Sequence, residues 1–282
     1  MEITADSKTD GFRFALGAFD LDGTVLRRDL TITEATLRSL GRLRGLGVRL
    51  VVATGRRYEA AREHARRLGF GEEDPVICYG GSVVRRINGE TLLHRTLPVQ
   101  ASLEVLRWAA ERGLHARLFL DGRIVSSPNT SAVVRHMRYL EEPGLSVVDS
   151  PALWLERSGE PPIKIVVVDH PEEIEGWLRE AREAFRGRLF VTRSLPHYVE
   201  IGNPAGTKSK ALAFLCERWG IGREGVLAFG DAENDIDMLR FAGHGVAVGG
   251  MNAAVREAAD AVAAPIEEDG VARYIERLLG EA

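Results

Sequence analysis

The stretch RFALGAFDLDGT, residues 13–24, runs from an apolar segment into two aspartates that are separated by one residue and followed at once by Gly23. An Asp-Gly pair alone is typical of a tight turn. Two like charges this close repel each other unless one is protonated or a cation lies nearby. The rest of the chain therefore decides whether Asp20 and Asp22 belong to a turn or to a reactive site.

Apolar runs rich in β-branched residues alternate with helical patterns after this stretch. Residues 31–47 and 56–70 have a helical period, whereas 48–54 and 75–81 read as buried strands. This alternation is typical of βαβ units and predicts an α/β fold with a doubly wound, parallel, Rossmann-like core sheet. Thr33 carries a helix-capping signal.

The rhythm changes after Pro98, where helical stretches alternate with short paired strands, and the parallel rhythm returns near residue 197. We therefore expect an α+β cap domain at 98–196, inserted into a core domain formed by 1–97 and 197–282. One expected cap helix is TSAVVRHMRYLEE, residues 130–142.

Composition limits the classes of function. The 282 residues include 45% hydrophobic and 28% charged residues, with a formal net charge of -4. These values are typical of a globular protein with no electrostatic preference for nucleic acid or membranes. The first eleven residues are polar, and no apolar run approaches the ~20 residues of a membrane span. We expect a cytoplasmic protein without nucleic-acid or membrane partners.

Polar residues gather where the expected parallel strands end, which is the edge at which open α/β sheets bind ligands. These residues are Asp20, Asp22, Thr54, Gly55, Asp231, Asn234 and Asp235. Crowded carboxylates suit a magnesium ion that keeps several of its waters. The chain also has 33 arginines but only four lysines, of which Lys208 and Lys210 lie at one helix start. A lysine in that setting indicates a compact positive charge beside a phosphate.

An aspartate beside Mg²⁺, with a hydroxyl and a lysine, is typical of phosphoryl transfer through an aspartyl-phosphate. Asp20, at the strand end, would attack phosphorus. Asp22 would protonate the leaving oxygen and later deprotonate the hydrolytic water. Gly23 would permit the tight turn that directs both carboxylates inward.

Four motifs in this order resemble those of the haloacid dehalogenase superfamily of phosphatases: DLDGT at 20–24, ATGR at 53–56, Lys208 at a helix start, and GDAEND at 230–235. The inserted module makes the chain similar to the Cof-type branch. So do the stretches VEIGNPAGTKSKAL, AVGGMNAAV and EEDGVARYIE, residues 199–212, 247–255 and 267–276.

The resemblance implies a magnesium site and roles for its ligands. Asp20 corresponds to the nucleophile, which also binds the metal. Asp22 corresponds to the general acid and base, whose backbone carbonyl binds Mg²⁺, and Asp231 corresponds to the third protein ligand. Asp235 corresponds to a residue that supports the metal site from outside the direct ligands.

The resemblance also implies a phosphate site and a class of substrate. Thr54, Gly55, Lys208 and Asn234 correspond to the residues that hold the phosphate. Sugar phosphates lead as substrates, followed by pyridoxal phosphate and nucleotides, with the leaving group recognised by the cap. The chain departs from the family at Tyr79-Gly80-Gly81, where Asn-Gly-Ala is usual. If the Tyr79 phenol lies near the site, the substrates of relatives are a weaker guide to the substrate of this chain. A role of Tyr79 in packing is an equally good explanation.

Three other functions stay open. A phosphosugar mutase would use the same fold and the same aspartates, and release of inorganic phosphate distinguishes the two. A signalling receiver domain also uses a phosphorylated aspartate, but it is a compact domain of roughly 100 residues without an inserted module. An inactive phospholigand-binding protein would normally have lost one of the acids, and all of them are present.

Overall fold

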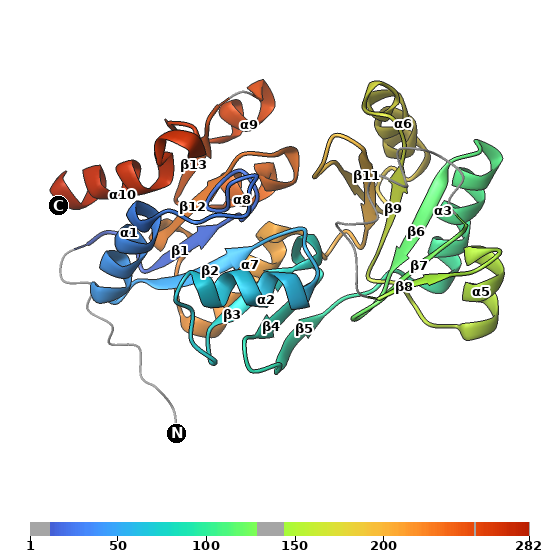
Figure 1. Ribbon diagram of the computed structural model, residues 1–282, viewed down its shortest axis with the longest axis horizontal. Coiled ribbons are helices and arrows are strands. Elements are labelled where there is room, and N and C mark those ends of the chain that lie inside the picture. The colour runs from blue at the N-terminus through green and yellow to red at the C-terminus, as the bar shows by residue number, and fades with distance from the viewer. Residues whose placement is uncertain (1–11, 129–143, 251, 282) are drawn as a thin grey trace. The chain divides into compact units, whose positions relative to one another are not determined.

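The computed structural model describes residues 12–128, 144–250 and 252–281. The chain divides into two compact units (Figure 1): Met1–Leu93 with Thr207–Ala282 form the first, and His94–Gly206 form the second. Residues 130–142, expected as a helix, lie outside the described residues. Within those residues, no helix has both the length and the apolar character that crossing a membrane requires.

The first unit is built on an eight-stranded sheet with the order β14-β13-β12-β1-β2-β3-β4-β5. Its strands are β1 Leu16–Phe19, β2 Arg49–Ala53, β3 Pro75–Cys78, β4 Val83–Arg86, β5 Thr91–His94, β12 Val226–Gly230, β13 His244–Val248 and β14 Ala261–Ala263. From β14 to β3 every neighbouring pair is parallel. This arrangement confirms the predicted α/β fold with a parallel, Rossmann-like core.

Helices cover both faces of this sheet. They are α1 Glu34–Gly45, α2 Tyr58–Arg67, α7 Lys208–Trp219, α8 Ile236–Phe241, α9 Ala253–Ala258 and α10 Gly270–Glu281. On one face, Leu16 and Ala18 share a buried cluster with Leu212 of α7. On the other face, the Phe19 ring stacks on Phe229 with centroids 5.3 Å apart, and Phe229 meets Tyr274 of α10 edge-on. Since both faces of β1 are covered, all four of its residues are buried.

Threonines begin two of these helices. Thr33 Oγ1 accepts a hydrogen bond from the backbone N–H of Thr36 at 3.2 Å, as the sequence predicted. Thr207 caps α7 in the same way, accepting from Lys210 N at 3.4 Å. Each cap satisfies an N–H that has no partner within the helix. The second cap also makes Lys208 the first residue of α7.

Strands β4 and β5 were not predicted. β4 runs antiparallel to β3, with Cys78 opposite Val83, and extends the sheet edge beyond the parallel strands. A turn at Asn88-Gly89 separates β4 from β5, and Gly89 has φ +99°, a conformation that glycine adopts without strain. Asn-Gly is a strong hairpin signal, but a hairpin does not belong to the alternation of strands and helices from which the sheet was predicted.

The second unit has a six-stranded sheet with the order β10-β11-β9-β6-β7-β8. Its strands are β6 His115–Phe119, β7 Ile124–Ser126, β8 Leu145–Val147, β9 Lys164–Val168, β10 Phe190–Thr192 and β11 Tyr198–Gly202. Its described helices are α3 Val99–Glu111, α5 Pro151–Ser158 and α6 Pro171–Ala184.

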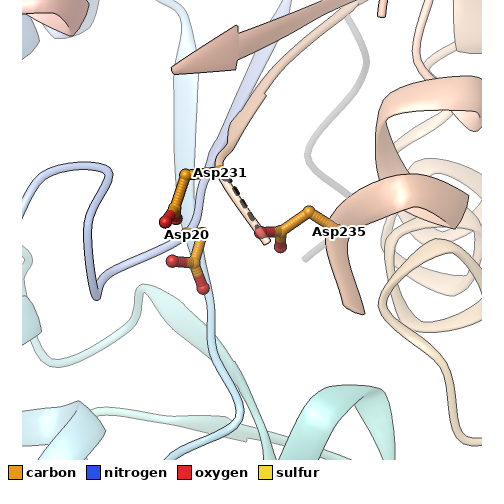
Figure 2. A group of neighbouring side chains, drawn as sticks. All are labelled: Asp20, Asp231 and Asp235. Carbon is orange, nitrogen blue, oxygen red and sulfur yellow. Dashed lines mark hydrogen bonds between the residues drawn. The ribbon is translucent and has the colours of Figure 1, made fainter. Parts of the chain in front are cut away.

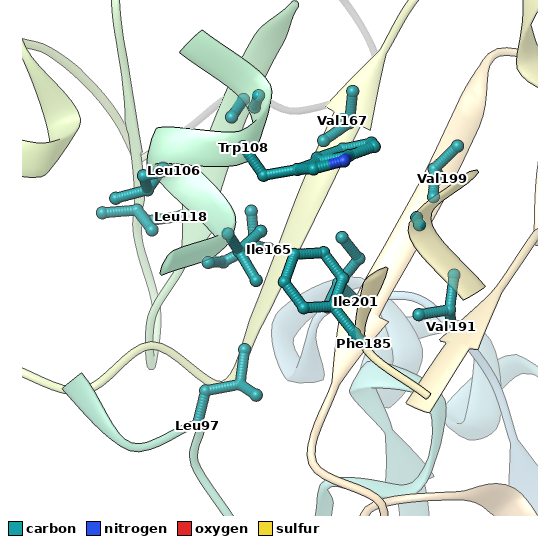
Figure 3. Close-up of a cluster of buried hydrophobic side chains, with 14 of the residues drawn as sticks. Leu97, Leu106, Trp108, Leu118, Ile165, Val167, Phe185, Val191, Val199 and Ile201 are labelled. Atoms are coloured by element: carbon teal, nitrogen blue, oxygen red, sulfur yellow. The ribbon is translucent and has the colours of Figure 1, made fainter. Parts of the chain in front are cut away.

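This second unit has a core of its own. Figure 3 shows the cluster, in which Trp108 of α3 meets Phe185 edge-on with ring centroids 5.8 Å apart, beside Ile165 and Val167 of β9. Such a core is what an independently folded domain requires. That this unit works as a cap stays a prediction.

Candidate active site

Two acids stand at the carboxyl ends of the neighbouring strands β1 and β12. Phe19 is directly opposite Phe229, so Asp20 and Asp231 leave the sheet at the same edge. Asp235 comes from η4, the short 3-10 helix Glu233–Asp235. Figure 2 shows the three side chains close together, and ligand oxygens of all three lie within 4.8 Å of one another.

Lys208 joins two of these acids. Its Nζ donates to Asp20 Oδ1 and to Asp235 Oδ1, both at 2.5 Å, and its side chain is fully buried. Burial alone would lower the pKa of Lys208, but the charges of Asp20 and Asp235 outweigh it and raise the pKa. Lys208 therefore stays a cation inside the site.

The carboxyl groups carry more negative charge than Lys208 neutralises. Burial, followed by the charges of Asp235, Asp231 and Asp22, raises the pKa of Asp20 well above its ordinary value, against the opposing effect of Lys208. Burial and the charge of Asp235 likewise raise the pKa of Asp231 to about 7. A cation among these oxygens would relieve the crowding, and carboxylate oxygens suit a hard divalent ion. Asp20, Asp231 and Asp235 could therefore hold a metal ion.

Asp235 is tied to the protein through both oxygens. Its Oδ2 accepts from the backbone N–H groups of Asp231 at 3.1 Å and Ala232 at 3.0 Å, while Oδ1 accepts from Lys208. These bonds fix the loop that carries Asp231.

The turn after Asp22 fits tightly against Asp231. Gly23 has φ +82°, and a Cβ at this position would overlap the Asp231 carboxylate. Thr24 Oγ1 donates to Asp231 Oδ1 at 3.0 Å. Glycine is therefore required here for both backbone conformation and space.

The Asp22 carboxylate makes its hydrogen bonds elsewhere. Arg56 binds both of its oxygens, from Nε to Oδ2 at 2.7 Å and from Nη2 to Oδ1 at 2.6 Å. The Asp22 side chain is 43% exposed, whereas that of Asp20 is 7% exposed. The two aspartates of the motif thus have different cationic partners and different access to solvent.

A family model described as haloacid dehalogenase-like hydrolase matches residues 18–275. The chain belongs to this family. The match includes Asp20 and Asp231, together with the whole second unit. The predicted family is therefore confirmed.

Curated relatives are named phosphatases. The chain is 29% identical to the 5-amino-6-(5-phospho-D-ribitylamino)uracil phosphatase YitU of Bacillus subtilis (strain 168), over 92% of this chain and 95% of that protein. It is 27% identical to the pyridoxal phosphate phosphatase YbhA of Escherichia coli (strain K12), over 92% and 96%. These relatives confirm the prediction of a phosphatase.

A solved structure agrees with the fold. A haloacid dehalogenase-like hydrolase from Bacteroides thetaiotaomicron superposes with a TM-score of 0.78 and is 28% identical, over 94% of this chain and 99% of that one. The similarity extends through both units rather than through the core alone.

The remaining residues that the sequence singled out lie near this edge. Thr54 is buried directly after β2, and its Oγ1 accepts from the backbone N–H of Arg56 at 3.1 Å. Gly55 follows Thr54. Asn234 is buried in η4, next to Asp235.

The departure from the family motif forms a left-handed turn. Tyr79, Gly80 and Gly81 have φ values of +51°, +71° and +110°, and Tyr79 is buried. Asparagine tolerates this region better than a bulky side chain does, so Tyr79 adds local strain. Its backbone N–H donates to the carbonyl of Arg56 at 2.9 Å.

Two residues that contact this constellation, Thr24 and Arg56, were not predicted from the sequence. Both stand inside stretches quoted for the motifs, DLDGT and ATGR. Because both follow strand ends, their position at the ligand-binding edge was the available signal.

Proposed function

We propose that the protein is a magnesium-dependent phosphatase that hydrolyses small phosphomonoesters through an aspartyl-phosphate on Asp20. The observation that carries this proposal is the placement of Asp20 beside the buried ammonium of Lys208 and among the carboxylates of Asp231 and Asp235. A cation and a metal-binding acidic group around one carboxylate are what phosphoryl transfer requires.

The first half of the reaction forms a bond between an Asp20 oxygen and phosphorus. The bond from phosphorus to the leaving oxygen breaks, its electron pair stays on that oxygen, and Asp22 supplies the proton. In the second half, water attacks phosphorus and gives its proton to Asp22. The bond from Asp20 to phosphorus then breaks and releases inorganic phosphate.

The other residues bind and orient the phosphate. Lys208 supplies positive charge to its oxygens, and Thr54, Gly55 and Asn234 supply hydrogen-bond donors to it. All three lie on segments that follow the strands β2 and β12.

Magnesium would be held by the carboxylates of Asp20 and Asp231 and by the backbone carbonyl of Asp22, with Asp235 outside the direct ligands. When bound, it supplies the charge that lets a carboxylate approach a phosphate anion. The raised pKa values of Asp20 and Asp231 support a cation at this place.

Sugar phosphates and similar phosphorylated metabolites are the proposed substrates, and the site is expected to work in the cytoplasm. The names of the relatives support this class, since one acts on a phosphorylated ribityl compound and another on pyridoxal phosphate. The second unit, His94–Gly206, is the proposed cap that would contact the leaving group and exclude water.

A phosphate-release screen tests the proposal. The protein is incubated with a panel of sugar phosphates, pyridoxal phosphate and nucleotides in the presence of Mg²⁺. We expect inorganic phosphate from at least one sugar phosphate, loss of activity with a chelator, recovery with Mg²⁺, and poor recovery with the larger Ca²⁺. Full activity in chelator would contradict the metal site. Isomerised substrate without free phosphate would favour a mutase.

A further inference from the structure

Arg56 binds Asp22 in a geometry that fixes the plane of a carboxylate. Two N–H groups of one rigid guanidinium meet the two oxygens at 2.7 and 2.6 Å. Among the residues that the structure describes, the Asp22 side chain makes these two hydrogen bonds and no others. Without Arg56, a side chain that is 43% exposed would be free to rotate.

Arg56 itself is held at both of its backbone polar groups. Its N–H donates to Thr54 Oγ1 at 3.1 Å, and its carbonyl accepts from Tyr79 N at 2.9 Å. β1 and β2 are parallel neighbours with Phe19 opposite Val52, so the segments carrying Asp22 and Arg56 leave the sheet side by side. The backbone under the guanidinium is therefore preorganised.

This pairing suits a residue that orients a proton carrier without taking up the proton itself. A guanidinium stays protonated in proteins, so Arg56 keeps its charge beside Asp22. An ionised carboxylate has about four acceptor positions, of which the fork occupies two. The others stay open to a leaving oxygen or a water.

We propose that Arg56 is a positioning residue, which orients the Asp22 carboxylate for the proton transfers of phosphate-ester hydrolysis. This inference rests on the proposed function. Each aspartate of the motif then has its own cation: Lys208 pairs with the nucleophile Asp20, and Arg56 pairs with the proton carrier Asp22.

Two esters of similar shape but different leaving groups test the role. Phenoxide needs a proton as it leaves, whereas p-nitrophenoxide does not. We expect Arg56→Gln to lower kcat/KM for phenyl phosphate about 10–100-fold, a part of the ~10²–10⁴-fold effect of general acid catalysis. For p-nitrophenyl phosphate, kcat/KM should change little. For this ester, kcat and KM should fall together, because the attack of water on the aspartyl-phosphate still needs Asp22 and becomes the slow step. The first turnover should then appear as a burst of p-nitrophenol.

Two further variants and a double-mutant cycle of Arg56 with Asp22 complete the test. Arg56→Lys keeps the charge without the fork and should recover part of the phenyl phosphate activity. Arg66→Gln is the matched control, because Arg66 pairs with Glu72 on the exposed side of α2 at 2.8 Å. In the Asp22→Asn background, Arg56→Gln should add little to the loss, since both changes remove one function.

Two results would overturn the role of Arg56. One is an equal loss of kcat/KM for the two esters in Arg56→Gln. The other is a loss from Arg56→Gln that is as large in the Asp22→Asn background as in the unmodified protein. Absence of turnover of both esters by the unmodified protein with Mg²⁺ would instead contradict the proposed function, and the inference with it. Circular dichroism of each variant confirms the fold before rates are compared.

Discussion

The backbone of Gly81 packs directly against the peptide that joins Thr207 to Lys208, so closely that a Cβ at Gly81 would overlap the Thr207 carbonyl. This contact joins the turn after β3 to the start of α7. The turn is the place where the chain departs from its family motif. The conformation of this turn therefore helps to fix the position of Lys208.

Gly81→Ala is expected to displace the start of α7 and lower activity. The new methyl group would push on the backbone of Thr207 and Lys208, and the residue has φ +110°, where a side chain is strained. Misplacement of a catalytic group by ~1 Å can cost ~10²-fold in rate. The measurement is kcat for phosphate release with Mg²⁺.

Gly80→Ala is the control for backbone strain. Gly80 also has positive φ, +71°, but a Cβ there meets no atom within 4 Å. We expect this variant to lose about 1–2 kcal/mol of unfolding free energy and to keep its activity. Equal kinetic damage from both substitutions would show that strain, and not contact with Thr207, matters at this turn.

Lys208→Met should abolish most of the activity, whereas Lys210→Ala should not. Lys208 is buried between two carboxylates, and its loss removes charge from the phosphate site. Loss of one donor to a transition-state charge typically costs ~10²–10³-fold in kcat. Lys210 is exposed on the same helix turn, so its substitution should leave kcat unchanged. A comparable loss in the two variants would contradict the assignment of Lys208.

The second unit should lose stability in mild acid because of His115. Arg117 Nε donates to His115 Nε2 at 3.3 Å, and Ser127 Oγ lies 3.2 Å from Nδ1, which suits the neutral ring. Burial, and then the charge of Arg117, lowers the pKa of His115 from 6.5 to about 4. Between these values the unfolded chain binds a proton that the folded chain does not. Stability is therefore complete above pH 6.5 and falls as the pH decreases towards 4.

Thermal unfolding as a function of pH measures this effect. His115→Gln removes the titrating ring, so its melting temperature should depend less on pH in that interval than the melting temperature of the unmodified protein. Parallel pH profiles for the two proteins would exclude His115 as the source.

The core of the site could be predicted because parallel strands bring distant residues to one edge. Asp20 and Asp231 are far apart in the chain, but Asp20 directly follows Phe19 of β1, and Asp231 comes two residues after Phe229, the partner of Phe19 on β12. The same reasoning could not predict which cation pairs with which acid. The distance of Lys208 from Asp20, and the choice of Arg56 for Asp22, depend on side-chain directions that no spacing rule gives.

The edge of the core sheet escaped prediction for a different reason. β4 and β5 belong to a hairpin around Asn88-Gly89, and hairpins depend on a local turn rather than on alternating strands and helices. The backbone conformation of Tyr79 could not be predicted from the sequence either. A tyrosine rarely adopts φ +51°, and the surrounding structure imposes this conformation.

Chemical trapping of the phosphorylated protein tests the central claim most directly. The protein is quenched with acid during turnover of p-nitrophenyl phosphate with Mg²⁺, then treated with borohydride, which reduces an aspartyl-phosphate to homoserine. Peptide mass spectrometry locates the change. We predict conversion of Asp20 alone, and no conversion when Mg²⁺ is withheld. Continued phosphate release with Asp20 unmodified, or with another residue converted, would contradict the account.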